Sequence, residues 1–347
     1  MKKFITFALV LTMVMLAGCG GGSSASAPAS PTAENSGQPA FEKLNLSIST
    51  SGTDLGIDAL TAKHFAELVE EASGGNIKAT VYPNCQLAGG SMPKSIELLI
   101  TGGNYEMAVF SGSVLGNIDE KFLTHSIPFI FDSYDSASAM MDGTGGEYYA
   151  KLFAEKGLVY MSGMHNGLRQ LTNNKLDISK PEDLRGLKVR VPSGEVYMKT
   201  LAEFGADPVA MNWSEVFTAL QQGTIDGHEN GYQTIDSANI YEVQKHMTEW
   251  NWSYDGYWLM SNQKDWAKFK PETQALLMEK AQEAALWGRK YLEDSEVQLK
   301  EKFKENGVTI TELTEEQMAE FAAVARPAQE YFINKFGAEA CTAWGLK

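Results

Sequence analysis

Strand-like and helix-like segments alternate along most of this chain, and glycines often follow the helices. Leu44 to Thr50 and Ile77 to Pro83 have the pattern of strands, and the amphipathic stretch from Asp58 to Ala72 lies between them. A helix-like segment, Pro93 to Ile100, then precedes the strand-like residues Glu106 to Phe110. Because a strand, a helix and another strand in succession usually form a parallel pair, this order predicts an α/β fold with largely parallel sheets.

The same order of elements returns further along the chain. Leu187 to Pro192 alternates like a strand, a helix-like segment runs from Glu195 to Phe204, and Asp207 to Met211 and Ser214 to Gln222 repeat the pair. Roughly three hundred residues after the N-terminal segments exceed one ordinary domain. Two lobes of related architecture are therefore expected. Their similarity does not require a duplication, because many α/β chains repeat strands and helices in this order.

A long helix is predicted from Pro271 to Asn306, with proline at its start and Gly307 just past its end. At 1.5 Å per residue it measures about 50 Å, which exceeds the depth of one lobe. We expect it to bridge both lobes. The strand-like residues Val308 to Leu313 and a last helix from Glu315 to Phe336 follow, and Pro327 is expected to kink or interrupt that helix.

The N-terminus has the features of an export signal. Two lysines precede an apolar run, which ends in Leu16, Ala17, Gly18 and Cys19. This resembles a bacterial lipoprotein signal, with residues 1–18 removed and Cys19 lipidated; an uncleaved membrane anchor is the alternative. Residues 20–40 are mostly Gly, Ser, Ala and Pro, so a flexible tether from the lipidated Cys19 is expected, and the folded part begins near Phe41.

Charge and cysteine content exclude several classes of function. Removing Lys2 and Lys3 with the signal changes the formal charge from -15 to -17. Such an acidic chain is unsuited to nucleic acids, so any anion site must be a local positive pocket.

Cys85 and Cys341 remain after lipidation, and whether they pair is open. The chain has no CxxC, HExxH or GxSxG motif, and we expect no metal or cofactor.

Two arginines lie on strand-like segments. In LKVRVP, Leu187, Val189 and Val191 alternate with polar residues, which places Arg190 on the opposite face of the strand. Arg169 in NGLRQLTN has similar surroundings. A guanidinium at a strand end can grip a carboxylate through two parallel hydrogen bonds. The alternative is that both arginines line a solvated sheet face.

Six motifs follow one another in the order and spacing of a known family: VYPNCQLAGG, IPFIFDSYDSA, NGLRQLTN, PEDLRGLKVRVP, NWSEVFTALQQGTIDGHEN and YEVQKH. From about Leu44 onward the chain resembles the solute-binding subunits of TRAP transporters (tripartite ATP-independent periplasmic carriers), of the dicarboxylate-binding type. The resemblance implies a two-lobed, periplasmic-binding-protein-like fold with a ligand cleft between the lobes and the long helix bridging both. Lobe I would comprise residues 41–166 and 256–295, and lobe II residues 167–255 and 296–347.

The resemblance also implies a ligand site. Arg190 would make the main salt bridge to the ligand carboxylate, and Arg169 and Asn230 would add donors. Trp213 would lie against the ligand's carbon skeleton. Ordinary core packing of Trp213 and a turn role for Asn230 are the alternatives.

Further candidate site residues come from positions where the chain differs from the family pattern and from a loop after a strand. His228 stands where the family usually has glutamine, and Gly231 where it usually has proline; His228 is either a ligand contact or a structural substitute. Ser111 and Ser113 follow a strand where a loop would face the cleft, and they are expected to reach the ligand's other end. The tract Thr248 to Trp258 is unusually aromatic, and either lines the cleft or packs a strand.

The function implied is that of a lipid-anchored, extracytoplasmic receptor, in the periplasm or at the cell surface. It would capture an organic acid and deliver it to the small and large TRAP membrane subunits. A receptor that feeds a sensor kinase and an extracytoplasmic enzyme acting on an organic acid are the alternatives. The identity of the acid, the coupling ion, the membrane leaflet of the anchor and the oligomeric state stay open.

Overall fold

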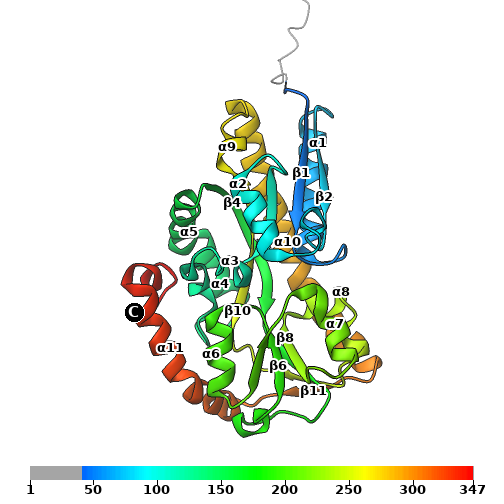
Figure 1. Ribbon diagram of the computed structural model, residues 1–347, viewed down its shortest axis with the longest axis vertical. Coiled ribbons are helices and arrows are strands. Elements are labelled where there is room, and N and C mark those ends of the chain that lie inside the picture. The colour runs from blue at the N-terminus through cyan, green and yellow to red at the C-terminus, as the bar shows by residue number, and fades with distance from the viewer. Residues whose placement is uncertain (1–40, 347) are drawn as a thin grey trace, which may run out of the picture. The chain divides into compact units, whose positions relative to one another are not determined.

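Two β-sheets with surrounding helices form residues 41–346, the part of the chain that the computed structural model describes (Figure 1). The signal peptide, Cys19 and the tether predicted for residues 1–40 lie outside it. The first sheet has the order β2 (Ile77–Tyr82), β1 (Leu44–Thr50), β3 (Met107–Ser111), β10 (Tyr254–Asn262), β4 (Leu158–Leu168). The second has the order β11 (Thr309–Glu312), β9 (His246–Glu249), β5 (Gln170–Asn173), β8 (Gly227–Asn230), β6 (Lys188–Val191), β7 (Asp207–Ala210).

Each sheet contains parallel pairs of strands, together with strands that cross between the sheets and run antiparallel to their neighbours. β1 pairs in parallel with β2 and β3, and β6 pairs in parallel with β7 and β8, as the succession of strands and helices predicts. β10 is antiparallel to β3 and β4, and β5 is antiparallel to β8 and β9. The two-lobed α/β fold is thereby confirmed, with sheets that are mixed because the crossing strands run against their neighbours.

Two strand connections cross between the sheets. Arg169 alone separates β4 from β5, and residues 250–253 separate β9 from β10. The backbone N–H of Arg169 donates to the Ser253 carbonyl at 2.9 Å, so the two crossing segments are hydrogen-bonded to each other.

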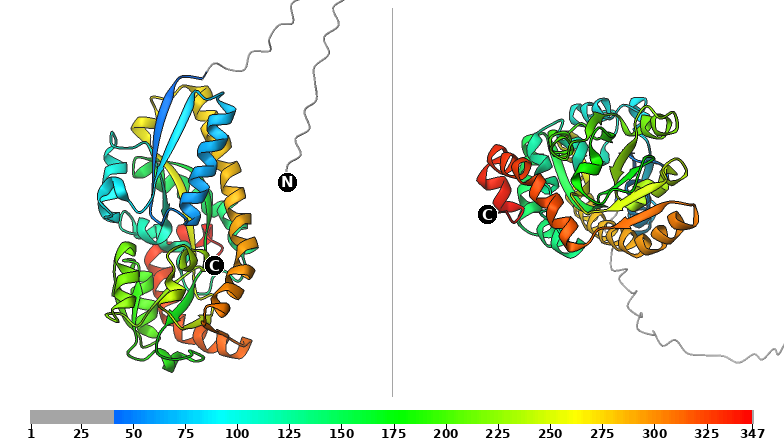
Figure 2. Two further views of the ribbon diagram at one scale, coloured as in Figure 1. Left: turned by 90° about the vertical axis from the view of Figure 1, so that its right-hand side faces the viewer. Right: turned by 90° about the horizontal axis from the view of Figure 1, so that it is seen from below.

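Helix α10 (Pro271–Glu305) extends along both sheets (Figure 2). Its first half packs with α1 (Ile57–Ala72) and β4, where Leu277 and Leu292 are buried. Its last turns pack with α8 (Tyr232–Ser237), where Phe303 is buried. The predicted bridging helix is therefore confirmed.

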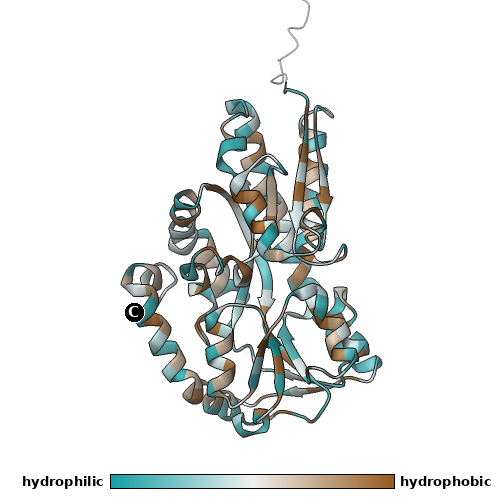
Figure 3. Cartoon of the chain, in the orientation of Figure 1, coloured by the Kyte–Doolittle hydropathy of each residue, from teal (hydrophilic) through white to brown (hydrophobic). Residues whose placement is uncertain are grey.

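The remaining helices cover the sheets. They are α2 (Met92–Thr101), α3 (Gly112–Leu115), α4 (Tyr134–Asp142), α5 (Thr144–Glu155), α6 (Glu195–Glu203), α7 (Trp213–Gln221), α9 (Gln263–Trp266) and α11 (Glu315–Ala343), with short 3-10 turns at Gln86–Ala88, Glu120–Ser126, Pro181–Leu184 and Ile240–Glu242. Apolar residues recur on the strands and on parts of the surrounding helices (Figure 3). No helix within residues 41–346 combines the length and the apolar character needed to traverse a bilayer.

The predicted interruption of the last helix at Pro327 is wrong. α11 stays helical through Pro327, and its non-helical residue is Gly337, with φ 86° and ψ 165°. An interior proline removes one hydrogen bond and crowds the carbonyl one turn earlier, at a cost of about 3 kcal/mol. The buried residues Phe321 and Phe332 pack the helix on both sides of Pro327 and hold it helical despite this cost.

After Gly337 the chain returns to the first sheet. Trp344 is buried in the same cluster as Tyr149 and Trp258, and the Thr144 hydroxyl donates to the Ala343 carbonyl at 2.7 Å. The C-terminal residues thus contact the elements around the first sheet as well as those around the second. The lobe limits given above remain a proposal.

Cys85 and Cys341 are both buried free thiols. Cys85 lies beside Met92, and Cys341 donates to the Ile333 carbonyl. The structure therefore shows no bond between them.

Candidate functional site

A cavity of about 310 Å³ lies between the two sheets. Its lining comes from both: Ser51, Gly52, Met92, Pro93, Ser111, Ser113, Val114, Asn117, Asn166, Arg169, Arg190, Pro192, Ser193, Ala210, Met211, Asn212, Trp213, Glu215, Asn230, Thr234 and Tyr257. Many of these residues stand at or just after the carboxyl ends of β1, β3, β6, β7 and β8. Loops at such strand ends are where α/β sheets usually bind ligands.

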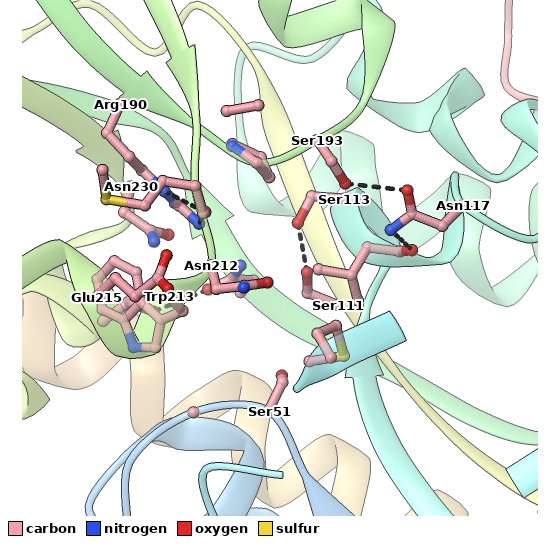
Figure 4. A pocket seen from close by; sticks show the side chains of 18 of the residues that line it. Ser51, Ser111, Ser113, Asn117, Arg190, Ser193, Asn212, Trp213, Glu215 and Asn230 are labelled. Carbon is pink, nitrogen blue, oxygen red and sulfur yellow. Dashed lines mark hydrogen bonds between the residues drawn. The ribbon is translucent and has the colours of Figure 1, made fainter. Parts of the chain in front are cut away.

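Arg190 occupies one wall of the cavity (Figure 4). It is only 4% exposed, and its Nε and Nη2 donate to the Met211 carbonyl at 3.0 and 2.7 Å. Its guanidinium lies 5.4 Å from the ring centre of Trp213. Within residues 41–346 it forms no salt bridge, and burial lowers its pKa to about 10. A buried guanidinium whose hydrogen-bond partner is a carbonyl rather than a carboxylate is suited to receive an anion.

Arg169 has the opposite situation, although it also lines the cavity. It bonds to both carboxylate oxygens and the carbonyl of Glu229, and its Nη1 donates to Asp255 at 3.0 Å. Both acids are fully buried. Asp255 also accepts from Asn166 at 2.9 Å and lies 3.2 Å from the ring nitrogen Nε2 of His125. Arg169 is thus the centre of an internal ion network.

The charges of this network stabilise one another. Burial disfavours the charged form of Arg169, but Glu229 and Asp255 raise its pKa above the ordinary value. Burial alone would raise the pKa of Asp255, whereas the bonds from His125 and the charge of Arg169 hold it below the ordinary value. The positive charge of Arg169 is therefore balanced before any ligand arrives.

Asn230 and Trp213 lie next to Arg190 (Figure 4). The Asn230 oxygen accepts from the Gly231 N–H at 3.0 Å. Gly231 has ordinary extended backbone, but an added Cβ would lie 2.5 Å from the Asn166 carbonyl, so glycine permits this close approach. Amide, guanidinium and aromatic ring therefore meet on one wall.

Ser111 and Ser113 lie on the other wall, at the end of β3 and the start of α3 (Figure 4). Their buried hydroxyls bond to each other, and the Ser113 N–H donates to Asp255 at 3.2 Å. Both predicted serines therefore reach the cavity, opposite Arg190.

The structure does not bring His228 to the cavity lining. Its ring is fully buried, its Nδ1 lies 2.7 Å from the Thr172 hydroxyl, and Trp213 lies against it with ring centres 5.9 Å apart. Burial and the two arginines lower the pKa of His228 well below its ordinary value, so the ring is neutral. The arrangement matches the alternative of a structural substitute.

Sequence reasoning identified part of the remaining lining. In the aromatic tract, Tyr257 lines the cavity, whereas Trp250 and Trp252 are buried in a core cluster. Ser51, Asn117 and other loop residues were not identified, although their position after predicted strands was a usable signal.

Contacts between segments from the two sides lie beside the cavity. The Ser193 hydroxyl, after β6, donates to the Asn117 side-chain oxygen at 3.0 Å (Figure 4). On another side, the Thr53 hydroxyl donates to the Ser237 carbonyl at 3.1 Å, and the Ile57 N–H donates to Gln233 at 2.9 Å. The structure therefore has the two lobes in contact around the cavity.

Two α/β lobes around a cleft that contains a buried arginine without a salt bridge among the described residues are the architecture of a solute-binding protein. The family model of bacterial extracellular solute-binding proteins, family 7, matches residues 48–335, and the chain belongs to that family. The predicted resemblance to TRAP solute-binding subunits is thereby confirmed.

Relatives and solved structures agree with this assignment. The chain is 30% identical, over 81% of its length and 79% of the relative, to the C4-dicarboxylate-binding protein DctB of Bacillus subtilis. A TRAP periplasmic solute-binding protein of a Polaromonas species, solved with D-erythronate, is 30% identical with a TM-score of 0.82, covering 88% of this chain and 99% of that one. One from Sulfurospirillum deleyianum with succinate has 26% identity and a TM-score of 0.82, with the same coverage. The chain is therefore a TRAP-type extracytoplasmic solute-binding receptor.

Proposed function

We propose that this receptor captures an organic acid by a salt bridge from Arg190 and delivers it to the TRAP membrane subunits. The observation that carries the proposal is the Arg190 guanidinium, buried in the cavity wall with no salt bridge in the described part of the chain. Succinate and D-erythronate, bound by the two similar structures, share the carboxylate that such a group would hold.

Each neighbouring side chain has a defined role in this proposal. The Arg190 N–H groups not used by the Met211 carbonyl grip the carboxylate, and the Asn230 amide orients it. The Trp213 ring packs against the carbon skeleton. Ser111 and Ser113 bind the far end of the ligand, and Arg169 supports the wall and contributes its remaining N–H.

The site binds its ligand without transforming it. In this proposal the ion network around Arg169 is structural, because its acids are fully buried and already bonded. A thermal-shift screen of the purified protein against organic acids tests capture. A saturating ligand at a hundredfold excess over Kd adds about 2.7 kcal/mol of stability. No shift with any acid, or recovery of a chemically altered acid, would contradict the proposal.

Delivery rests on the export signal and the family. Residues 1–18 are removed, Cys19 carries the lipid, and residues 19–40 tether the lobes (41–166 with 256–295, and 167–255 with 296–347) to the membrane beside the small and large subunits. Uptake by reconstituted vesicles should require an ion gradient. Uptake that survives collapse of the gradient but stops without ATP would contradict a TRAP partner.

A further inference from the structure

Two helices from different cores meet beside the cavity. Helix α1 belongs to the apolar cluster around the first sheet, where Phe65 is buried, and α8 belongs to the cluster around the second sheet, where Ile235 is buried. Three hydrogen bonds join the start of α1 and the loop before it to α8. The bonded residues are between 176 and 184 positions apart in sequence, so the placement of the two lobes brings them together.

Gln233, on α8, caps α1 from the other side. The residue before the first turn of α1 is Gly56, which makes no side-chain cap. The first N–H of the helix, that of Ile57, donates to the Gln233 side-chain oxygen at 2.9 Å, and the Gln233 amide donates to the Leu55 carbonyl at 2.7 Å. The first N–H groups of a helix have no partner within it. The buried Gln233 side chain therefore takes the role that a capping residue of α1 would have.

Thr53 makes the reciprocal contact at the end of α8. Its hydroxyl donates at 3.1 Å to the carbonyl of Ser237, the last residue of that helix. The last carbonyls of a helix also lack a partner within it. Gln233 and Ser237 stand four residues apart, on one face of α8. The two bonds of Gln233, to Leu55 and Ile57, and the bond of Thr53 to Ser237 together form a clasp between the lobes.

The loop that carries the clasp also borders the cavity. Ser51 and Gly52 line the cavity, and so does Thr234 beside Gln233, whereas the five clasp residues, all within the described chain, do not. Asp58 is buried behind the loop and accepts from the Gly52 N–H at 2.6 Å and from the Ser51 hydroxyl at 3.2 Å. The loop is thereby fixed to α1. An acid in the cavity lies between walls that the clasp holds together, without contact to the clasp itself.

We propose that Gln233 is a positioning residue that slows release of the bound acid by holding the two lobes closed. The inference rests on the proposed function and concerns its release step. The acid leaves the cavity when the lobes separate, and their separation also breaks the clasp. Because the clasp does not contact the acid, its loss should speed dissociation and leave the association step nearly unchanged.

Stopped-flow kinetics of Gln233→Met tests the proposal, because methionine has a similar length and forms neither hydrogen bond. The probe is the tightest-binding acid of the thermal-shift screen, which includes succinate and D-erythronate. The dissociation rate constant should rise about threefold or more, and the association rate constant should stay within about twofold. Thr53→Val removes one bond of the clasp and should speed dissociation less. Gln222→Ala, at the exposed end of α7, should change neither rate.

Hydrogen exchange at the Ile57 amide distinguishes a closing contact from a permanent one. In the described part of the chain, the partner of this N–H is Gln233. Exchange should slow when the native protein is saturated with that acid, and it should slow much less in Gln233→Met.

Equal exchange at Ile57 in free and saturated native protein would overturn the inference, because the clasp would then be a permanent contact. Unchanged dissociation in folded Gln233→Met and Thr53→Val would overturn it as well. Both outcomes leave capture of the acid intact. Failure of every acid of the screen to bind would instead overturn the proposed function, and the inference with it.

Discussion

Among single side chains, the two arginines of the cavity have different partners and therefore different roles. Arg169 is 1% exposed and is held by Glu229 and Asp255 beneath the site, with its guanidinium 5.1 Å from the ring centre of Tyr197. Among the described residues, Arg190 forms no salt bridge, and its hydrogen-bond partner is the Met211 carbonyl. The first arginine stabilises the fold where the chain crosses between sheets, and the second is available to the ligand.

Arg169→Ala is expected to destabilise the protein strongly. The substitution leaves two buried carboxylates without a cation, and breaking a buried pair in this way costs about 3–5 kcal/mol. Urea unfolding should show the loss as a lower midpoint, whereas the exposed Arg185→Ala serves as a near-neutral control. If Arg169→Ala is too unstable to purify, Arg169→Lys should show an intermediate loss. Native-like stability of both Arg169 variants would mean that the network is not structural.

Several site residues were predictable because they lie near the ends of recognisable strands. Arg190 and Asn230 are at the ends of β6 and β8, where side chains reach the cavity. His228 pairs with Arg190 in the sheet, but it stands two residues before the end of β8 and Trp213 lies against it. The acids that balance Arg169 are 60 and 86 positions away in sequence, so residue patterns could not reveal them.

Among the elements, α10 and the β4 crossover meet at a carboxyl group. The Tyr134 hydroxyl, on α4, donates to Glu296 of α10 and accepts from the Leu168 N–H at 3.2 Å. Burial, together with the nearby carboxylates Glu249 and Glu293, raises the pKa of Glu296 to about 7. Glu296 forms no salt bridge among the described residues. Its ionisation therefore opposes the packing of the helix against the crossover.

This contact predicts a pH dependence of stability. Glu296 binds its proton more tightly in the folded state, with a pKa of about 7, than in the unfolded chain, where 4.5 is ordinary. The native state is then favoured at low pH, and this contribution is lost as the pH rises from about 4.5 to 7. Glu296→Gln should raise stability at pH 8 by roughly 1–2 kcal/mol, a value reduced for partial solvent contact.

Thermal unfolding at pH 5 and pH 8 measures the effect. Glu296→Gln should narrow the stability difference between the two pH values, whereas Glu283→Gln, an exposed carboxylate on the same helix, should not. A stability gain of Glu296→Gln at pH 5 as large as that at pH 8 would contradict a titration of this group.

Element bounds followed from the sequence wherever glycine, proline or capping residues stand at the ends. α10 begins at Pro271 as predicted and ends one residue before the predicted Asn306. The last helix begins at Glu315 and stays helical to Phe336, as predicted, and a second helical segment follows the break at Gly337. The interruption expected at Pro327 did not occur, because tertiary packing outweighed the local preference of that residue. Which strands cross between sheets depends on long-range pairing that short-range periodicity does not contain.

At the scale of the whole described chain, the contacts beside the cavity indicate a closed arrangement. The bond from Ser193 to Asn117 joins loops of opposite sides, and the bond from Thr53 joins a loop to Ser237 at the end of α8. Opening would separate these pairs while β4, β10 and α10 remain continuous. A ligand shifts such an equilibrium only through its greater affinity for the closed form.

Small-angle scattering should detect this shift. The radius of gyration is expected to fall when a saturating acid is added, because the ligand contacts both lobes in the closed form. Asn117→Ala removes the acceptor of the Ser193 hydroxyl. Without ligand, this variant should therefore have a larger radius of gyration than the native protein. Identical profiles for free and saturated native protein would indicate a preformed pocket without lobe movement.

The most direct measurement of the central claim is the affinity of Arg190 variants for the best acid from the screen, by calorimetry. Arg190→Ala should weaken binding by about 2–5 kcal/mol, thirtyfold or more, because the desolvated carboxylate loses its counter-charge. Arg190→Lys should also bind poorly, since an ammonium lacks the bidentate fork, whereas Arg185→Ala should bind like the native protein. Unchanged affinity in a folded Arg190→Ala protein would contradict the account.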